Sequence, residues 1–85
     1  MAQKPVRSVN SAAYDALLEV LRAERERAGE TSHSLSKAMG EGPMFVHKVE
    51  HRERRLDVVE FVELARALGI EPRELFDRWL AKLGS

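Results

Sequence analysis

The sequence predicts an all-α domain of five short helices, and three observations indicate this class. Apolar residues recur at spacings of three and four along most of the chain, which is the period of a helix that buries one face. Capping residues and glycines stand where such helices would begin and end. A chain of 85 residues with 44% hydrophobic content is also long enough for one domain with one modest core.

The first predicted helix covers residues 12–28 and has apolar residues along one face. Asn10 or Ser11 can cap its start by accepting a backbone N–H bond. The residues before it show no helical period and include a proline. We therefore expect a flexible N-terminal arm over residues 1–10, followed by a folded domain over residues 11–85.

A tight turn separates the second and third predicted helices. Thr31 or Ser32 caps the second helix, and Gly42 and Pro43 start the third, because proline needs no N–H partner in a first helical turn. The third helix fades into the charged stretch 51–55. Two short helices joined in this way are typical of a helix-turn-helix, whose second helix enters the DNA major groove.

The fourth predicted helix has the clearest start signal in the chain. Asp57 is its cap, and Glu60, three residues later, completes a pair of the capping-box type. Gly69 ends this helix, and the fifth helix opens at Pro72 and runs to about Leu83. Connections of two to five residues between the helices predict a compact bundle.

The fifth helix has a wider apolar stripe than a closed five-helix core requires. This stripe either covers the first and fourth helices of its own chain or forms part of a two-fold dimer interface, and we favour the dimer because aromatic anchors are common at such interfaces. The expected interface residues are Phe76, Trp79, Leu80 and Leu83.

Composition limits the kind of partner and the compartment. The formal net charge is zero, which argues against a generic nucleic-acid coat. Residues 1–56 nevertheless hold ten basic against eight acidic residues, so the positive end coincides with the helix-turn-helix. No apolar run approaches the ~20 residues of a membrane span, and no signal peptide is evident. We expect a cytoplasmic, nucleoid-associated protein without membrane contact.

No pattern in the chain predicts an enzyme, a metal centre or a cofactor. The sequence has no glycine-rich phosphate loop and no carboxylate pair with a site around it. His47 and His51 are four residues apart, which can chelate a metal, but no third ligand accompanies them in a clear geometry. We therefore expect a non-enzymatic protein without a cofactor.

Four segments in register resemble the Cro/C1-type (XRE-like) helix-turn-helix repressors. The resemblance implies a compact five-helix, lambda-repressor-like domain in which the second and third helices form the DNA-binding unit. The segments are LRAERERAG at 21–29, LSKAMG at 35–40, FVHKVEHRERRLD at 45–57 and LARALGIEP at 64–72.

The same resemblance implies roles for individual residues. Arg25 and Glu50 occupy the positions of an internal ion pair that ties the third helix to the scaffold. Five residues occupy outward positions of the recognition helix or lie beside them and are expected to face the bases: Pro43, Met44, Phe45, His47 and Lys48. Five others are expected to contact phosphates: Thr31, Ser32, Arg52, Arg54 and Arg55.

The chain departs from the family pattern at the positions that read bases. Family members commonly have glutamine where this chain has Ser32, and serine or threonine followed by glutamine at its Gly42-Pro43. Arg52 also replaces a usual turn glycine. Glutamine reads adenine through two hydrogen bonds, which proline and methionine cannot form. Polar contacts are left to His47 and Lys48, and Met44 or Phe45 is expected to contact thymine methyl groups. Either residue could instead belong to the core, and Met44 is the better candidate for exposure because the resemblance implies a half-buried residue at Phe45.

These features predict a sequence-specific transcriptional regulator that represses by binding an inverted-repeat operator as a homodimer. Two alternatives stay open. The first is an antitoxin that binds a toxin and its own promoter. The second is a protein-interaction adaptor that retains the fold but no longer reads bases. The apolar surface of Pro43, Met44 and Phe45 and the neutral net charge favour this alternative.

Overall fold

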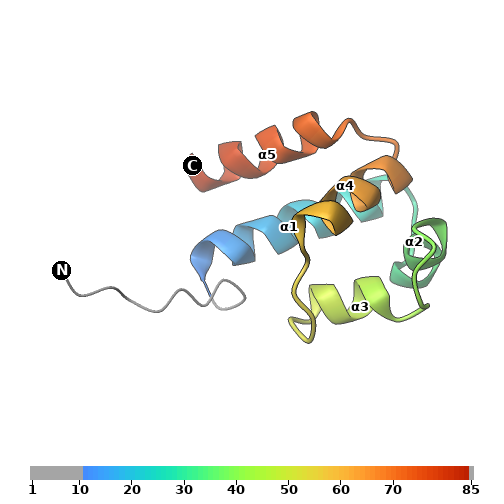
Figure 1. The fold of residues 1–85 in the computed structure, drawn as a ribbon. Helices are drawn as coiled ribbons and strands as arrows, with labels where there is room; N and C mark the ends of the chain where they lie inside the picture. The colour runs from blue at the N-terminus through green and yellow to red at the C-terminus, as the bar shows by residue number, and fades with distance from the viewer. Residues whose placement is uncertain (1–10, 85) are drawn as a thin grey trace.

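The computed structural model describes residues 11–84, which form five helices in the predicted order (Figure 1). The all-α class is thereby confirmed, while the arm expected at residues 1–10 lies outside the described residues. No helix within the described part is both long and apolar enough to cross a membrane. The helices are α1 (Ala12–Arg27), α2 (Ser32–Ala38), α3 (Phe45–Glu50), α4 (Val58–Ala67) and α5 (Pro72–Gly84).

Side-chain caps start three of the helices, as the sequence indicated. The Ser11 hydroxyl accepts the Tyr14 N–H at the start of α1 over 3.1 Å. Thr31 caps α2. Asp57 and Glu60 form a reciprocal capping box at α4, in which each side chain accepts the backbone N–H of the other, over 2.8 and 3.0 Å. These bonds satisfy donors that have no partner inside the helix.

Helix α3 begins at Phe45, so the expectation that Gly42 and Pro43 start this helix is wrong. Residues 42–44 instead form a turn in which the Gly42 carbonyl accepts the Phe45 N–H over 3.1 Å. Met44 is the N-cap residue, and its side chain has no group that could cap the helix. A capping group for α3 must therefore come from elsewhere in the fold.

Arg52 ends α3 in a left-handed conformation, with φ of 63°. Gly40 has the same role after α2, with φ of 77°, and a glycine adopts that conformation without a steric penalty. In both turns the N–H of the following residue donates to a carbonyl in the last turn of the helix. Glu41 donates to the Ser36 carbonyl over 3.0 Å, and Glu53 donates to the Lys48 carbonyl over 2.8 Å. An arginine at this position costs ~1 kcal/mol relative to glycine, so other contacts must hold it.

One apolar core joins all five helices. Helix α1 packs against α3 and α5, α2 packs against α3 and α4, and α4 packs against α5. Figure 1 shows α3 and α5 on opposite sides of the layer formed by α1 and α4, so the domain presents two separate outer faces. The core residues are Tyr14, Leu17, Leu18, Leu21, Leu35, Phe45, Val46, Val49, Leu56, Phe61, Leu64, Ala65 and Leu75.

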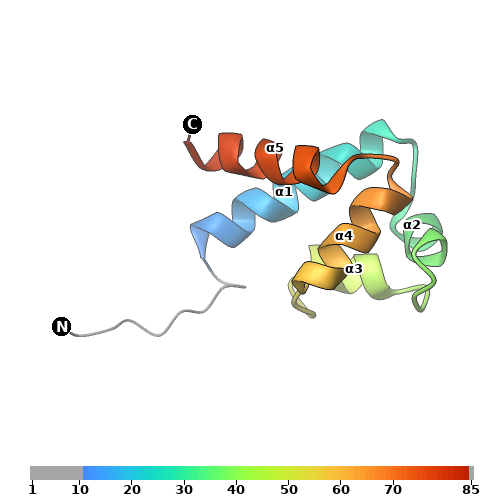
Figure 2. The same ribbon diagram turned by 45° about the horizontal axis from the view of Figure 1, so that its top comes forward.

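Helix α5 runs back along α1 in the opposite direction (Figures 1 and 2). The Trp79 indole N–H donates to the Ala13 carbonyl over 2.9 Å. The Arg78 guanidinium pairs with the buried Glu24 carboxylate over 2.6 Å. Trp79 therefore packs on α1 of its own chain, which agrees with the alternative that the apolar stripe covers the first and fourth helices. The other stripe residues stay exposed, and they are Phe76, Leu80 and Leu83.

Candidate nucleic-acid interface

The two helices of the helix-turn-helix are joined by a buried polar contact as well as by the core. The Ser36 side chain is fully buried, and its hydroxyl donates to the Ser32 carbonyl over 2.7 Å. The same oxygen accepts the Val46 N–H over 2.9 Å. Ser36 of α2 thus caps α3, which has no side-chain cap of its own. Sequence reasoning missed this role, since the only signal was a serine directly after the inward-facing Leu35.

The ion pair between Arg25 and Glu50 forms as predicted and ties α3 to α1. Two nearly parallel contacts join the guanidinium to the carboxylate, over 2.6 and 3.0 Å. Arg25 also donates to the Glu30 carbonyl over 2.9 Å, at the turn before α2. The bonded carboxylate raises the pKa of Arg25 above its ordinary value. The contacts of one guanidinium therefore fix α3 relative to both α1 and α2.

Phe45 does not face outward, so the expectation that it contacts bases is wrong. Its side chain belongs to the core, and only 7% of the residue is exposed. The ring lies under the Arg54 guanidinium, whose carbon is 4.7 Å from the ring centroid. Phe45 supports the recognition helix from within because it fills the core at the first turn of α3.

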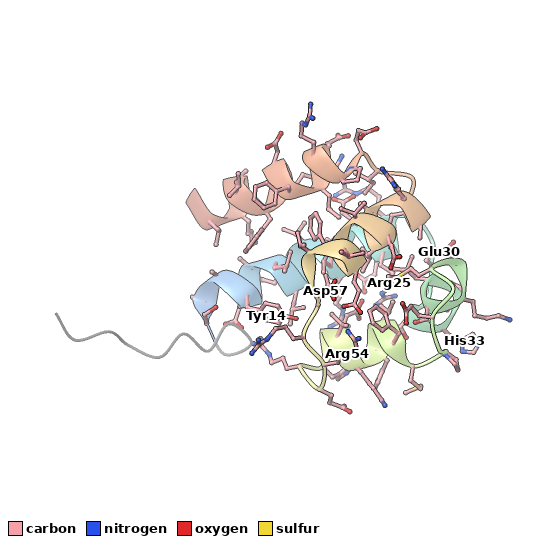
Figure 3. All side chains as sticks on the ribbon, in the orientation of Figure 1. Tyr14, Arg25, Glu30, His33, Arg54 and Asp57 are labelled. Atoms are coloured by element: carbon pink, nitrogen blue, oxygen red, sulfur yellow. The ribbon has the colours of Figure 1, made fainter. Side chains whose placement is uncertain are left out.

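Arg54 lies at the surface of the domain, where its exposed side chain links the Phe45 ring of α3 to Glu60 of α4 (Figure 3). Its guanidinium contacts both oxygens of the Glu60 carboxylate over 2.8 Å, and it also donates to the Arg55 carbonyl over 3.0 Å. The Glu60 hydrogen bond raises the pKa of Arg54, and the same bond lowers the pKa of Glu60, partly offset by burial. Arg54, which was expected to contact phosphate, therefore also fixes the loop after α3 to α4.

The three arginines of this loop differ in their partners. Arg52 pairs with Asp15 of α1, which holds its left-handed turn in place. Arg54 pairs with Glu60. The Arg55 side chain is exposed and makes no ion pair within residues 11–84. Only Arg55 therefore offers a cation without a carboxylate partner in the described part of this loop.

The outer surface of α3 combines apolar, aromatic and cationic groups. Met44 is 50% exposed, and Pro43 and Lys48 are exposed beside it. The rings of His47 and His51 stack with centroids 4.0 Å apart, and His51 Nδ1 lies 2.8 Å from the His47 carbonyl oxygen. Within residues 11–84, no cluster of three or more histidine, cysteine or acidic side chains could hold a metal.

The start of α2 presents the two residues expected to contact phosphate there. Thr31 is exposed, and its hydroxyl accepts the Ser34 N–H over 3.0 Å as part of the helix cap. Ser32 is partly exposed, and its carbonyl accepts the Ser36 hydroxyl. These two residues therefore lie on the rigid α2–α3 unit rather than on a separate loop.

A hollow of about 350 Å³ lies in front of α3 on this face. The turn before α3 forms one wall, and α3 together with the following loop forms the other. The lining residues are Glu41, Gly42, Pro43, Met44, Phe45, Lys48 and Arg54.

Comparison with solved structures finds a similar chain that spans nearly the whole domain. It is described as an XRE-family like protein from Pseudomonas syringae pv. tomato str. DC3000. The two chains are 39% identical, the match covers 88% of this chain and 92% of that one, and the TM-score is 0.79. No family model and no curated protein matches this sequence.

Proposed function

The chain belongs to the XRE-like helix-turn-helix family, and we propose that it is a DNA-binding transcriptional regulator that represses by occupying an operator as a dimer. The observation that carries this proposal is the rigid α2–α3 unit. It is held by Ser36 and by the Arg25–Glu50 pair, and it presents Met44 and Lys48 outward. A short helix with an exposed outer face is the element that enters a major groove.

The proposed phosphate contacts follow from the charges around α3. Lys48 and Arg55 have no carboxylate partner within residues 11–84 and are the strongest candidates to replace counterions on DNA. Arg52 and Arg54 share their charge with carboxylates, so we assign them a weaker electrostatic role. The hydroxyls of Thr31 and Ser32 complete the proposed backbone contacts at the start of α2.

The proposed base contacts come from Pro43, Met44, His47 and Lys48. Lys48 is the only cation of this set and can donate to guanine acceptors in the major groove. Proline and methionine offer only apolar surface. The neutral net charge of the chain means that affinity depends on this local surface rather than on a general attraction to DNA.

The proposed dimer uses the face opposite α3. Phe76, Leu80 and Leu83 are 43 to 46% exposed on α5, and Val58 and Val59 at the start of α4 are 77% and 63% exposed. A two-fold interface there would leave both α3 helices free to enter successive major grooves ~34 Å apart. Such a dimer would select an inverted-repeat operator.

A protein-interaction adaptor is the second candidate function, and the exposed Met44 favours it. An apolar side chain that is 50% exposed beside Pro43 is also suited to a protein partner. The antitoxin alternative is a variant of the regulator in which the exposed α5 residues bind a toxin instead of a second copy.

A genomic-fragment selection with purified protein at ~150 mM salt tests the proposed function. We expect enrichment of a short inverted repeat and loss of that enrichment in Lys48→Ala/Arg55→Ala. Arg73→Ala is the matched control, because Arg73 is an exposed arginine of α5 without an ion pair in the described residues. Equal recovery of all fragments would contradict the proposal and favour the adaptor.

A further inference from the structure

A pocket of about 250 Å³ lies where α1, the start of α4 and α5 meet. Its aromatic walls are Tyr14, Phe61, Phe76 and Trp79, and the only other tyrosine, tryptophan or phenylalanine in the chain is Phe45. The Phe76 ring meets those of Phe61 and Trp79 edge to face, with centroids 6.3 and 5.6 Å apart. An apolar cavity of about 150 Å³ takes up benzene, so this aromatic pocket can hold an apolar group of roughly one or two rings.

The Tyr14 hydroxyl supplies the first polar group of the aromatic pocket. Tyr14 is 6% exposed, and its hydroxyl oxygen accepts the Leu56 N–H over 3.2 Å. The hydrogen of this hydroxyl has no acceptor among residues 11–84. Because an unused buried donor is unfavourable, a ligand that accepts this hydrogen bond gains affinity from it.

Arg55 supplies the second polar group, and its place is tied to the first. The Tyr14 oxygen bonds to the N–H of the peptide that joins Arg55 to Leu56, so the hydroxyl lies next to the base of the Arg55 side chain (Figure 3). Arg55 lines the pocket, is exposed and forms no ion pair within the described residues. Asp57 also lines the pocket, but its carboxylate accepts the Glu60 N–H as the cap of α4. A ligand therefore meets two neighbouring donors, of which one is cationic.

We propose that the aromatic pocket binds a small apolar carboxylic acid and that this ligand releases the protein from DNA. The carboxylate accepts the Tyr14 hydrogen and pairs with the Arg55 guanidinium, while the apolar tail lies among the aromatic rings. A neutral apolar molecule would forgo the charge of Arg55, and an amine would place a second cation beside it. The apolar walls thus select the tail, and the two donors select the acid group.

The link to DNA comes from Arg55, and this part of the inference rests on the proposed function. Arg55 is also one of the two strongest candidates for a phosphate contact. A guanidinium that is paired with the ligand is not available to a phosphate, so the acid and DNA compete for one cation. Two binding events that are coupled in this way weaken each other by the same factor.

The test follows the fluorescence of Trp79, the only tryptophan of the chain, in the purified full chain. The probes are 3-phenylpropionate, its neutral amide and 3-phenylpropylamine, which share the apolar part and differ in charge. We expect saturable binding of the acid with a Kd of about 1 mM or lower. The amide and the amine should bind at least about tenfold more weakly, the factor for about one charge-assisted hydrogen bond.

Two variants assign the binding to the polar groups of the pocket. Arg55→Gln should remove the preference for the acid over the amide, and Tyr14→Phe should weaken both, because each carries an oxygen acceptor. Arg73→Gln is the matched control, since Arg73 is an exposed arginine of α5 outside the pocket, and it should keep the preference. Circular dichroism verifies the fold of each variant. Tyr14→Phe also removes the acceptor of the Leu56 N–H, so Arg55→Gln decides the matter if that variant unfolds.

A second measurement tests the effect on DNA. The operator recovered by the genomic-fragment selection is titrated with and without saturating 3-phenylpropionate, and acetate at the same concentration is the control. We expect 3-phenylpropionate to lower operator affinity at least about fivefold. Acetate, which has no apolar tail, should leave the affinity unchanged.

Each outcome supports or overturns a stated part of the inference. No saturable change in Trp79 fluorescence, or equal affinity for the acid and the amide, would overturn the ligand site and leave the proposed function intact. A fluorescence change that follows protein concentration and ignores the acid would also overturn it and assign the pocket to a second copy, because Phe76 belongs to the proposed dimer face as well. Binding of the acid without loss of operator affinity would overturn the release from DNA. If the acid binds but no DNA fragment is enriched, the proposed function fails and the ligand site stands.

Discussion

Glu50→Ala tests whether the Arg25–Glu50 pair holds the recognition helix in place. The Arg25 and Glu50 side chains are 13% and 9% exposed, so the substitution leaves a largely buried guanidinium without its carboxylate. Breaking a buried pair by removing one partner costs ~3–5 kcal/mol. We expect the lower end, ~3 kcal/mol, because Arg25 keeps its bond to the Glu30 carbonyl. A domain of this length has an unfolding free energy of ~4–13 kcal/mol, so the loss is a large share of it.

Urea unfolding followed by circular dichroism measures this loss, and a thermal scan should show a melting temperature lower by at least ~12 °C. Glu26→Ala is the matched control, because Glu26 pairs with Arg22 on α1 while both side chains are at least 60% exposed. Its unfolding free energy should change by less than ~0.5 kcal/mol. If Glu50→Ala and Glu26→Ala differ by less than ~1 kcal/mol, then the buried pair does not anchor α3 and the reasoning from its burial is refuted.

Three further predictions concern the Ser36 cap, the Arg54–Glu60 pair and the exposed Arg55. Ser36→Ala should lower the unfolding free energy by ~1–3 kcal/mol, because it leaves the Val46 N–H buried without an acceptor, and a urea titration that shows no change would contradict this. Arg54 lowers the pKa of Glu60, so the stability from this carboxylate is present above its unfolded-state pKa of ~4.3 and is lost as pH falls through the lower folded-state pKa. Glu60→Gln should therefore destabilise the domain at pH 6 and by less at pH 3, whereas equal differences at both pH values would argue against the coupling. Arg55→Ala should reduce the salt dependence of DNA binding by about one unit without changing the melting temperature, while Arg54→Ala should also lower the melting temperature, and the opposite pattern would reverse the two roles.

Local signals in the sequence were enough for the helices and for their order. The caps at Thr31 and Asp57 act on N–H groups within three residues, so they could be predicted without knowledge of the fold. The start of α3 was predicted two to three residues early because Pro43 is compatible with a first helical turn and equally with the tight turn that it occupies. Local chemistry could not distinguish these two conformations.

Family resemblance allowed the Arg25–Glu50 pair to be predicted, although its partners are 25 residues apart. The same resemblance did not indicate that Arg54 is bonded to Glu60. A helix of six residues has each side chain at a different angle to the core, and only packing decides which of them is covered.

The sequence by itself determined the all-α class, the helix order and the basic stretch after α3, because helical period, capping and composition are local properties. The tertiary structure alone decided which polar groups form hydrogen bonds and ion pairs within the domain. Ser36 caps the N–H of Val46, ten residues later in the chain, and Arg52 pairs with Asp15, 37 residues earlier. Such partners depend on the distance between helices rather than on spacing along the chain, and so does the grouping of Glu41, Met44 and Lys48 around one hollow.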